Sequence, residues 1–376
     1  MKSKMQIVYV CSSGAHEYWI NLANAISKKC NLHLFLPDSI RKTKIPQYLE
    51  EAITIHYFKK FKFYDIRNMI SILRVYKKIV ELSPNVIHLP GGIPFGLPII
   101  YPLIKLRFPL VITAHEPVPK TIPLYDMLLL KIQMIFADAM IVAGEAIKKE
   151  AMLYWKNKKL KIFVVPFGAF IHYNKLRKPN VNEEEGAVLF FGAITPHKGP
   201  EYLIEAEPLV SRKIQDFKII VAGKGFGRYK QLIREPEFFE IHDRYVSDQE
   251  LCELFQRASV VVLPYVSSFQ SGVIFTAYAF LKPVIVTNVG SLPESVSHLE
   301  TGLVIKPRSA RALSKAIITL LENKELRNKM KENIYRKVTQ EYSWDGIASM
   351  MLKTYCKTVK SEGSDLHVDS AFKKHA

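Results

Sequence analysis

Apolar residues gather in short runs along this chain, and polar stretches with helical periodicity separate them. The runs read as buried strands because both of their faces are apolar. Strands that alternate with helices predict parallel sheets covered on both faces, and therefore an α/β, doubly wound fold. The expected strands cover residues 5–10, 31–36, 85–88, 110–113, 139–142 and 161–165, then 187–191, 217–222, 259–263, 284–287 and 302–305.

Helices are expected between these strands, and several carry clear sequence signals. Ser247 and Glu250 have the spacing of a capping box at the start of one of them. The stretch 40–64 is basic and predicts irregular structure. The expected helices cover residues 16–27, 66–82, 121–136, 248–257, 272–280, 310–339 and 344–359.

The domain organisation follows from length and from one polar segment. A chain of 376 residues suggests two domains, each with its own core. Residues 173–185 are polar, lack periodicity and contain Pro179, which predicts a linker. We therefore expect Rossmann-like domains over 1–172 and 186–342, a final helix over 343–360, and a disordered tail over 361–376.

The stretch 259–294 contains the strongest sign of chemistry. A buried strand, a polar loop, a helix that begins near Gly272 and a second strand follow one another. Backbone N–H groups of Ser271, Gly272 and Val273 would be free at the helix start, at the carboxyl edge of the sheet. This arrangement favours a bound phosphate, and Gly272 would let it approach closely. The alternative is an ordinary helix start with a serine near its cap.

Two motifs extend this interpretation to a family. Residues 190–206 read F-F-G-A-I-T-P-H-K-G-P-E-Y-L-I-E-A, and residues 270–294 read Q-S-G-V-I-F-T-A-Y-A-F-L-K-P-V-I-V-T-N-V-G-S-L-P-E. Together they resemble the family 4 (group 1) retaining glycosyltransferases, in the branch with Gln-Ser-Gly at the phosphate loop. Weaker marks follow in order along the chain: Gly14, T-A-H-E-P at 113–117, A-D-A-M-I-V at 137–142, V-V-P-F-G at 164–168 and Y-S-W-D at 342–345.

The resemblance implies a GT-B fold, with two Rossmann-like domains facing each other across a cleft. The second domain would bind a nucleotide-sugar and the first a glycan or lipid-linked acceptor, with the last helix returning to the first domain. It further implies retention of configuration and no metal or other cofactor. His115 is the candidate catalytic residue. The diphosphate would bind Lys198, Gly199, Ser271, Gly272 and Val273, and the cleft would be lined by Gly14, His16, Glu116, Gly192, Gly223, Gln270, Thr276 and Glu294.

Each of these residues could also have an ordinary structural role. His115 could order its own loop, and His16 or Lys198 could be solvated. The chain also departs from the family, because Ala193 replaces a usual arginine, and Ser268 and Thr276 replace two glutamates. We hypothesise that cations of neighbouring loops restore the missing charge: Lys224, Arg228 or Arg244. The alternative is a non-catalytic GT-B protein that acts as a binding partner in glycan assembly.

The positive net charge of the chain makes an anionic membrane surface a further expected partner. The formal net charge is +18, and residues 1–172 alone hold 24 Lys and Arg against 11 Asp and Glu. Residues 41–78 hold ten of these cations with aromatic residues between them, which suits anionic lipid. The alternative is a solvated basic face over aromatic core residues. Specific nucleic-acid binding lacks any signature motif, and the glycine spacing disfavours a dehydrogenase.

The expected location is the cytoplasm, with peripheral attachment to the inner face of the membrane. The sequence has no recognisable signal peptide and no apolar run long enough to span a bilayer. Its four cysteines, Cys11, Cys30, Cys252 and Cys356, have no paired spacing, which fits a reducing compartment.

Overall fold

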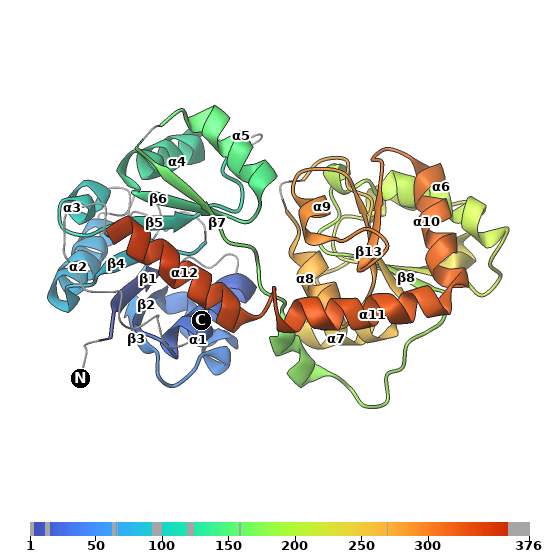
Figure 1. Ribbon diagram of the computed structural model, residues 1–376, viewed down its shortest axis with the longest axis horizontal. Helices are drawn as coiled ribbons and strands as arrows, with labels where there is room; N and C mark the ends of the chain where they lie inside the picture. Colours follow the sequence, from blue (N-terminus) through green and yellow to red (C-terminus); the bar gives the residue numbers. More distant parts are fainter. Residues whose placement is uncertain are drawn as a thin grey trace. The chain divides into compact units, whose positions relative to one another are not determined.

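The computed structural model describes residues 4–11, 16–61, 65, 67–91, 100–118, 124–157, 159–268 and 270–359. The chain forms two compact units (Figure 1). The first unit comprises residues 1–166 together with 344–376, and the second comprises residues 167–343. The polar segment 173–185 thus groups with the second unit, and the last helix with the first.

The first unit is built on a seven-stranded sheet in which all neighbouring strands are parallel. Its spatial order is β3 (Thr54–Phe58), β2 (Asn31–Pro37), β1 (Gln6–Val10), β4 (Val86–Leu89), β5 (Leu110–Thr113), β6 (Ala139–Val142) and β7 (Lys161–Val164). Its helices are α1 (His16–Ser27), α2 (Arg67–Leu82), α3 (Tyr101–Lys105), α4 (Leu124–Phe136), α5 (Glu145–Trp155) and α12 (Trp344–Val359).

The second unit repeats this plan with six parallel strands. Their order is β10 (Phe239–His242), β9 (Lys218–Ala222), β8 (Ala187–Phe191), β11 (Val260–Leu263), β12 (Val284–Thr287) and β13 (Gly302–Ile305). The helices are α6 (Pro200–Ser211), α7 (Asp248–Arg257), α8 (Gly272–Ala279), α9 (Leu292–Ser295), α10 (Ala310–Glu322) and α11 (Lys324–Thr339).

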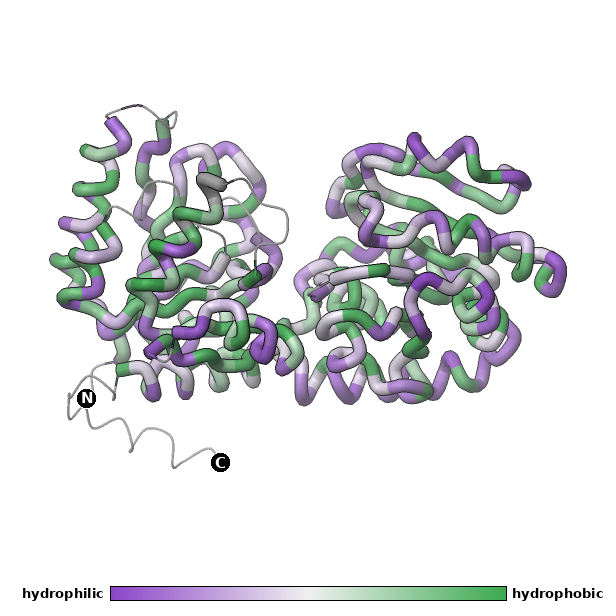
Figure 2. The backbone as a smooth tube through the Cα atoms, turned by 90° about the horizontal axis from the view of Figure 1, so that it is seen from above, coloured by the Kyte–Doolittle hydropathy of each residue, from purple (hydrophilic) through white to green (hydrophobic). Residues whose placement is uncertain are grey.

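The central strands form the core of each unit. Every residue of β4, β5, β6, β11 and β12 is buried, as expected for strands covered on both faces. Helices outside the sheets alternate between hydrophobic and hydrophilic residues along their length (Figure 2). The predicted doubly wound architecture is therefore confirmed in both units.

Three expectations about individual elements were wrong. The stretch 40–64 contains strand β3, and β10 was missed in the second unit. The single helix expected over 310–339 is two helices, because Asn323 caps the second one: its Oδ1 accepts a hydrogen bond from Leu326 N at 2.8 Å. The capping box of Ser247 and Glu250 is confirmed at the start of α7.

No helix among the described residues is long and apolar enough to cross a membrane. The expected tail over 361–376 lies outside the described residues.

Candidate functional site

In the sheet of the second unit, the chain proceeds from β8 through β9 to β10 toward one edge, and from β11 through β12 to β13 toward the other. The direction of the strand order therefore reverses between the neighbouring strands β8 and β11. Open α/β sheets bind ligands at such a point, outside the carboxyl ends of the strands. The loop after β8 contains Gly192, Lys198 and Gly199, and the loop after β11 leads to Ser271 and Gly272. The fold therefore brings both sequence motifs to the same edge of one sheet.

The Lys198 loop is fixed by its own backbone. It forms a 3₁₀ helix over Pro196–Lys198 that ends at Gly199, whose φ is +64°. A Cβ at Gly199 would lie 2.3 Å from the Pro264 carbonyl oxygen, so only glycine allows this packing. Val266 N also donates to His197 O at 2.8 Å. The loops that follow β8 and β11 are thus held together, and Lys198 is positioned between them.

The Lys198 ammonium lies in a partly buried space beside Gly192 and the start of α8. A Cβ at Gly192 would lie 2.8 Å from Lys198 Nζ and 3.9 Å from Val273 Cγ2. The Tyr265 ring lies 5.5 Å from the ammonium. Burial lowers the pKa of Lys198 to about 8. No carboxylate among the described residues forms an ion pair with it, so the charge is available to a ligand anion.

The start of α8 lies at the same place. Ser271 is the N-cap, and its Oγ accepts a hydrogen bond from Val273 N at 3.3 Å. Tyr265 Oη and Ser271 Oγ are 3.3 Å apart, so one hydroxyl orients the other. Tyr265 is a site residue that the motifs did not single out, although it stands in the loop that they bracket. The helix end adds partial positive charge next to Lys198.

The first unit places its candidate residue at the corresponding edge. His115 follows β5, hydrogen-bonds the Pro90 backbone after β4, and meets the Tyr18 ring edge-on at 5.2 Å between centroids. Burial lowers the pKa of His115 to about 4, so its imidazole is neutral at physiological pH. Glu116 is exposed. Gly14 lies outside the described residues.

His16 occupies the first turn of α1. Its Nε2 lies 3.2 Å from Glu17 Oε1, and its side chain is 36% exposed. This position agrees with either a ligand contact or a solvated histidine.

A buried chain of hydrogen bonds lies behind His115. Tyr9 Oη and Tyr355 Oη are 2.8 Å apart, and Tyr355 Oη lies 2.6 Å from His88 Nδ1. His88 Nε2 lies 2.9 Å from Thr113 Oγ1, at the end of β5. Burial lowers the pKa of His88 to about 3, which keeps the ring neutral. The network joins α12 to β5, the strand that precedes His115.

Family models match both parts of the chain. Residues 173–337 match the model "Glycosyl transferases group 1", and residues 12–169 match "Glycosyltransferase Family 4". Both halves of the chain belong to glycosyltransferase families. With its two parallel-sheet units and its structural neighbours, this glycosyltransferase has the GT-B fold.

Its relatives bear related names. An uncharacterized glycosyltransferase of Methanocaldococcus jannaschii is 25% identical over 344 residues, which cover 87% of this chain and 90% of the relative. The capsular polysaccharide biosynthesis glycosyltransferase CapM of Staphylococcus aureus is 26% identical over 62% of this chain and 65% of its own. Several other relatives match over only 45–47% of their own length.

A solved structure supports the fold. The Anabaena protein HepE, in complex with UDP and glucose, superposes with a TM-score of 0.69 and 18% identity. The match covers 94% of this glycosyltransferase and 100% of HepE.

Two glycines and one threonine of the predicted site have different surroundings from those expected. A Cβ at Gly272 would lie 3.2 Å from Phe170 Cε2, so an aromatic ring packs against this glycine. Gly223, with φ of +141°, packs against the Gly192 carbonyl, where a Cβ would lie 2.1 Å from the oxygen. The Thr276 hydroxyl is buried and donates to Gly272 O at 3.2 Å. This hydrogen bond lies within helix α8.

The other two predicted residues lie near the ends of the motif. Gln270 is half-buried, and its Oε1 is buried without a hydrogen-bond partner among the described residues. Glu294 is exposed, and its Oε1 accepts from Ser291 Oγ at 3.3 Å. Gln270 Oε1 is therefore an acceptor that a ligand hydroxyl could satisfy.

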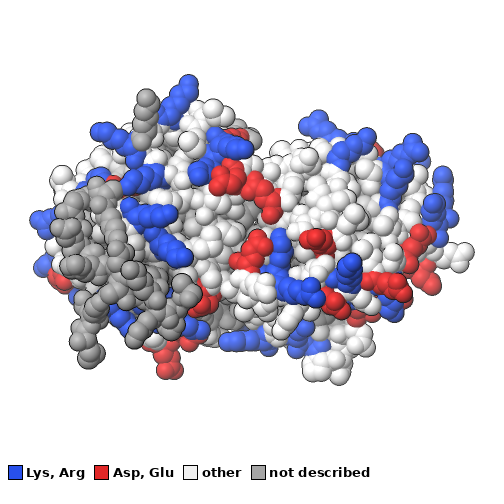
Figure 3. Space-filling model, viewed as in Figure 1, with Lys and Arg blue, Asp and Glu red and all other residues white. Residues whose placement is uncertain are grey.

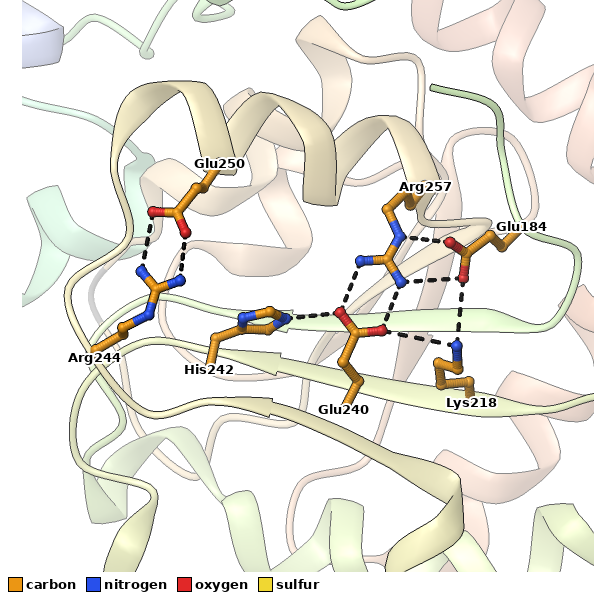
Figure 4. A network of polar contacts seen from close by, with 7 residues as sticks. All are labelled: Glu184, Lys218, Glu240, His242, Arg244, Glu250 and Arg257. Atoms are coloured by element: carbon orange, nitrogen blue, oxygen red, sulfur yellow. Dashed lines mark hydrogen bonds and ion pairs between the residues drawn. The ribbon is translucent and has the colours of Figure 1, made fainter. Parts of the chain in front are cut away.

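The three cations proposed to replace the missing arginine differ in their partners. Arg244 forms a two-point ion pair with Glu250 (Figure 4). Lys224 and Arg228 are exposed and have no ion-pair partner among the described residues. Ile194 N donates to Lys224 O at 2.8 Å, which places Lys224 next to Ala193 on the neighbouring loop. Lys224 is therefore the best placed of the three.

The turn that carries Lys224 is held by a residue that the sequence did not reveal. Asp243 Oδ1 accepts hydrogen bonds from Gly225 N at 2.7 Å and from Phe226 N at 3.0 Å. The pKa of Asp243 is lowered by these backbone donors. Asp243 thus shapes the glycine-rich turn after β9.

A second network in Figure 4 is fully paired. Arg257 donates to Glu184 and Glu240, each with a shortest contact of 2.5 Å, and Lys218 lies beside both carboxylates. Hydrogen bonds from Arg257 lower the pKa of Glu240 to about 2. These charges fix β9, β10 and α7 together, and each cation here has a carboxylate partner.

Proposed function

We propose that this protein is a retaining, nucleotide-sugar-dependent glycosyltransferase that transfers a sugar to a glycan or lipid-linked acceptor. The proposal rests on the Lys198 ammonium, which is partly buried beside Gly192 and the start of α8 and has no carboxylate partner among the described residues. Withdrawing an unpaired charge from water is costly unless an anion joins it. A diphosphate supplies that anion, and the helix start supplies backbone donors.

The chemistry follows from the position of these charges. The bond between the anomeric carbon and the diphosphate oxygen breaks, and the acceptor hydroxyl oxygen bonds to the same face of the sugar. The acceptor proton leaves with the diphosphate. Lys198 and the α8 amides stabilise the growing negative charge, so the proposed reaction needs no metal. In this scheme Gln270 Oε1 accepts from a ligand hydroxyl.

Nucleotide binding tests this proposal directly. Thermal unfolding is measured with UDP, GDP, dTDP and ADP sugars, and we expect one nucleotide to raise the midpoint. A ligand at 100 times its dissociation constant adds about 2.7 kcal/mol to the free energy of unfolding. UDP is the first choice because HepE was solved with it. A complete lack of response would instead favour the non-catalytic GT-B alternative.

We also propose that Lys224 supplies the charge that an arginine at position 193 gives other members of the family. Lys224→Ala should then weaken nucleotide-sugar binding by about tenfold, as expected for one lost charge-assisted hydrogen bond. Arg244→Ala is the matched control, because Arg244 is already paired with Glu250. Equal affinity of the parent and the Lys224 variant would remove Lys224 from the site.

We place this reaction in the assembly of a cell-surface polysaccharide or glycolipid. The similarity to CapM supports a polysaccharide product. The excess of Lys and Arg in the first half of the chain supports peripheral attachment to the anionic inner face of a membrane.

A further inference from the structure

A pocket of about 680 Å³ opens on the first unit between η1 (Asp38–Lys42), strand β3 and helix α2. None of the candidate site residues described above lines it. Figure 3 shows Lys and Arg side chains projecting around the unit that contains this pocket. Its charged lining residues are Asp38, Arg41, Lys59, Arg67, Arg74 and Lys78.

Hydrogen bonds and a cation–π contact build the wall of the pocket. Ser71 Oγ, on α2, donates to Lys59 O at 2.6 Å, and Phe61 N donates to Asn68 Oδ1 at 3.0 Å. The guanidinium of Arg67 lies 4.5 Å from the centre of the Phe61 ring. The backbone of segment 59–61 is therefore held against α2, which keeps Lys59 at the pocket.

The charge of the pocket is only partly neutralised. Arg41 pairs with Asp38 at 3.1 Å and Lys78 with Glu81 at 3.0 Å, while Arg67 pairs with Asp65. Neither Lys59 nor Arg74 has an ion-pair partner among the described residues. Ammonium and guanidinium groups both bind phosphate well. The pocket is therefore suited to a phosphate group.

Helix α2 adds an apolar ridge beside these cations. It buries Asn68, Ile72, Val75 and Ile79 on one face, at the spacing of an amphipathic helix. Away from that face, Met69, Ile70 and Leu73 are 37%, 51% and 51% exposed. Ile70 also lines the pocket. A soluble phosphate ligand needs no such ridge, whereas apolar and basic residues side by side are typical of a helix that lies in a membrane interface.

We propose that this pocket binds the phosphate headgroup of an anionic phospholipid, while Met69, Ile70 and Leu73 insert between the lipids. This inference deepens the proposed membrane attachment and rests on it. It also changes which residues enter the lipid. Tyr57 is half-buried, and the Arg41 guanidinium covers it at 4.0 Å from the centre of the Tyr57 ring. The exposed apolar surface therefore comes from α2 instead of from Tyr57.

Vesicle sedimentation with the full chain tests the pocket. The protein should bind vesicles of phosphatidylcholine with phosphatidylglycerol, and bind those of phosphatidylcholine alone weakly. Replacing Lys59→Glu and Arg74→Glu together should lower the partition coefficient at least about 30-fold, since each cation near such a surface contributes about fivefold. Replacing Ile70→Ser and Leu73→Ser should lower it by about tenfold.

A matched control separates the pocket from general charge. Lys131→Glu with Lys353→Glu makes the same change in net charge at two exposed positions of the first unit outside the pocket. This pair should change the partition coefficient by no more than a few-fold. An equal loss in the control pair, or binding that ignores lipid charge, would overturn the proposal. So would calorimetric binding of glycerol 3-phosphate to the pocket without vesicle binding, which would assign it to a soluble ligand.

The same variants distinguish this inference from the proposed function. Nucleotide-induced thermal shifts should be equal in the parent, the pocket variants and the control pair. Intact nucleotide binding without vesicle binding would remove only the lipid site. Vesicle binding without any nucleotide response would leave the lipid site and remove the proposed transferase function.

Discussion

Two lysines of the second unit are withdrawn from water, but their surroundings are opposite. Lys282 has a side chain that is 7% exposed, and its Nζ donates to Glu183 at 2.7 Å and to Gln256 O at 3.1 Å. Lys198 lies near a glycine turn, an aromatic ring and a helix start, with no carboxylate partner among the described residues. Burial with a partner indicates a structural role, whereas burial without one indicates a place kept for a ligand anion.

The largest effect should come from breaking the satisfied pair. Lys282→Ala leaves a partly buried Glu183 with Lys331 as its one remaining ion-pair partner among the described residues, so the free energy of unfolding should fall by about 3 kcal/mol. Burial opposes the ionisation of Glu183, but the two ammonium groups still lower its pKa. Urea denaturation measures the loss. The Lys331 side chain is 30% exposed, so Lys331→Ala should lower the free energy of unfolding by about 1 kcal/mol or less. A similar loss of stability in both variants would contradict the structural role assigned to the buried Lys282.

A second substitution would give Lys198 a carboxylate partner, as Lys282 already has. Val273→Asp places a carboxylate next to Gly192, on the side that faces the Lys198 ammonium. The new pair should occupy the anion site and repel a diphosphate, so nucleotide affinity should fall by at least about 100-fold, or 2.7 kcal/mol. Calorimetry with the nucleotide identified by thermal shift measures this. Val273→Asn, which has similar shape and no charge, is the control; if it loses affinity equally, charge is not the cause.

Removing the unpaired charge should affect binding without harming the fold. Lys198→Ala loses a charge-assisted hydrogen bond to the diphosphate, which lowers affinity by about tenfold to a hundredfold. Its free energy of unfolding should stay equal to that of the parent or rise, because a partly buried cation is removed. Unchanged nucleotide affinity would exclude Lys198 from the site, and a large loss of stability would show that it is structural.

The smallest expected effect is a dependence on pH. The pKa of Lys198 in the free protein is lowered from 10.5 to about 8 by burial, and a bound diphosphate favours the charged form. Above pH 8 the free protein loses this proton, so diphosphate affinity should fall by up to about tenfold per pH unit. Calorimetry at pH 7, 8 and 9 tests it. Lys198→Ala should lack this step; the same decline in that variant would assign it to another group.

The sequence predicted central elements better than edges for a physical reason. Central strands such as β5 and β12 are buried on both faces and appear as continuous apolar runs. The two missed strands, β3 and β10, are edge strands at the same position of each sheet. No residue of either is fully buried, so their composition carries histidine, threonine and glutamate rather than an apolar run.

The candidate site divides in the same way. Spacing along the chain and the order of a parallel sheet were enough to bring Gly192, Lys198 and Val273 together. The direction in which each side chain points could not be predicted from the sequence. Phe170 stands outside both motifs in the sequence, yet its ring lies beside Gly272, where a Cβ would be 3.2 Å from Phe170 Cε2. Likewise, the partner of Arg244 depends on how α7 meets the preceding loop.

The hydrogen bonds between Tyr355, Tyr9 and His88 have a consequence for how the protein is made. The first unit is interrupted in the chain by residues 167–343 and completed by α12. During synthesis the second unit emerges whole before α12 exists, so it can fold first. Until the last helix leaves the ribosome, His88 lacks its partner from Tyr355 and the α1 surface lacks its cover. The domain that begins the chain is therefore the last to be finished.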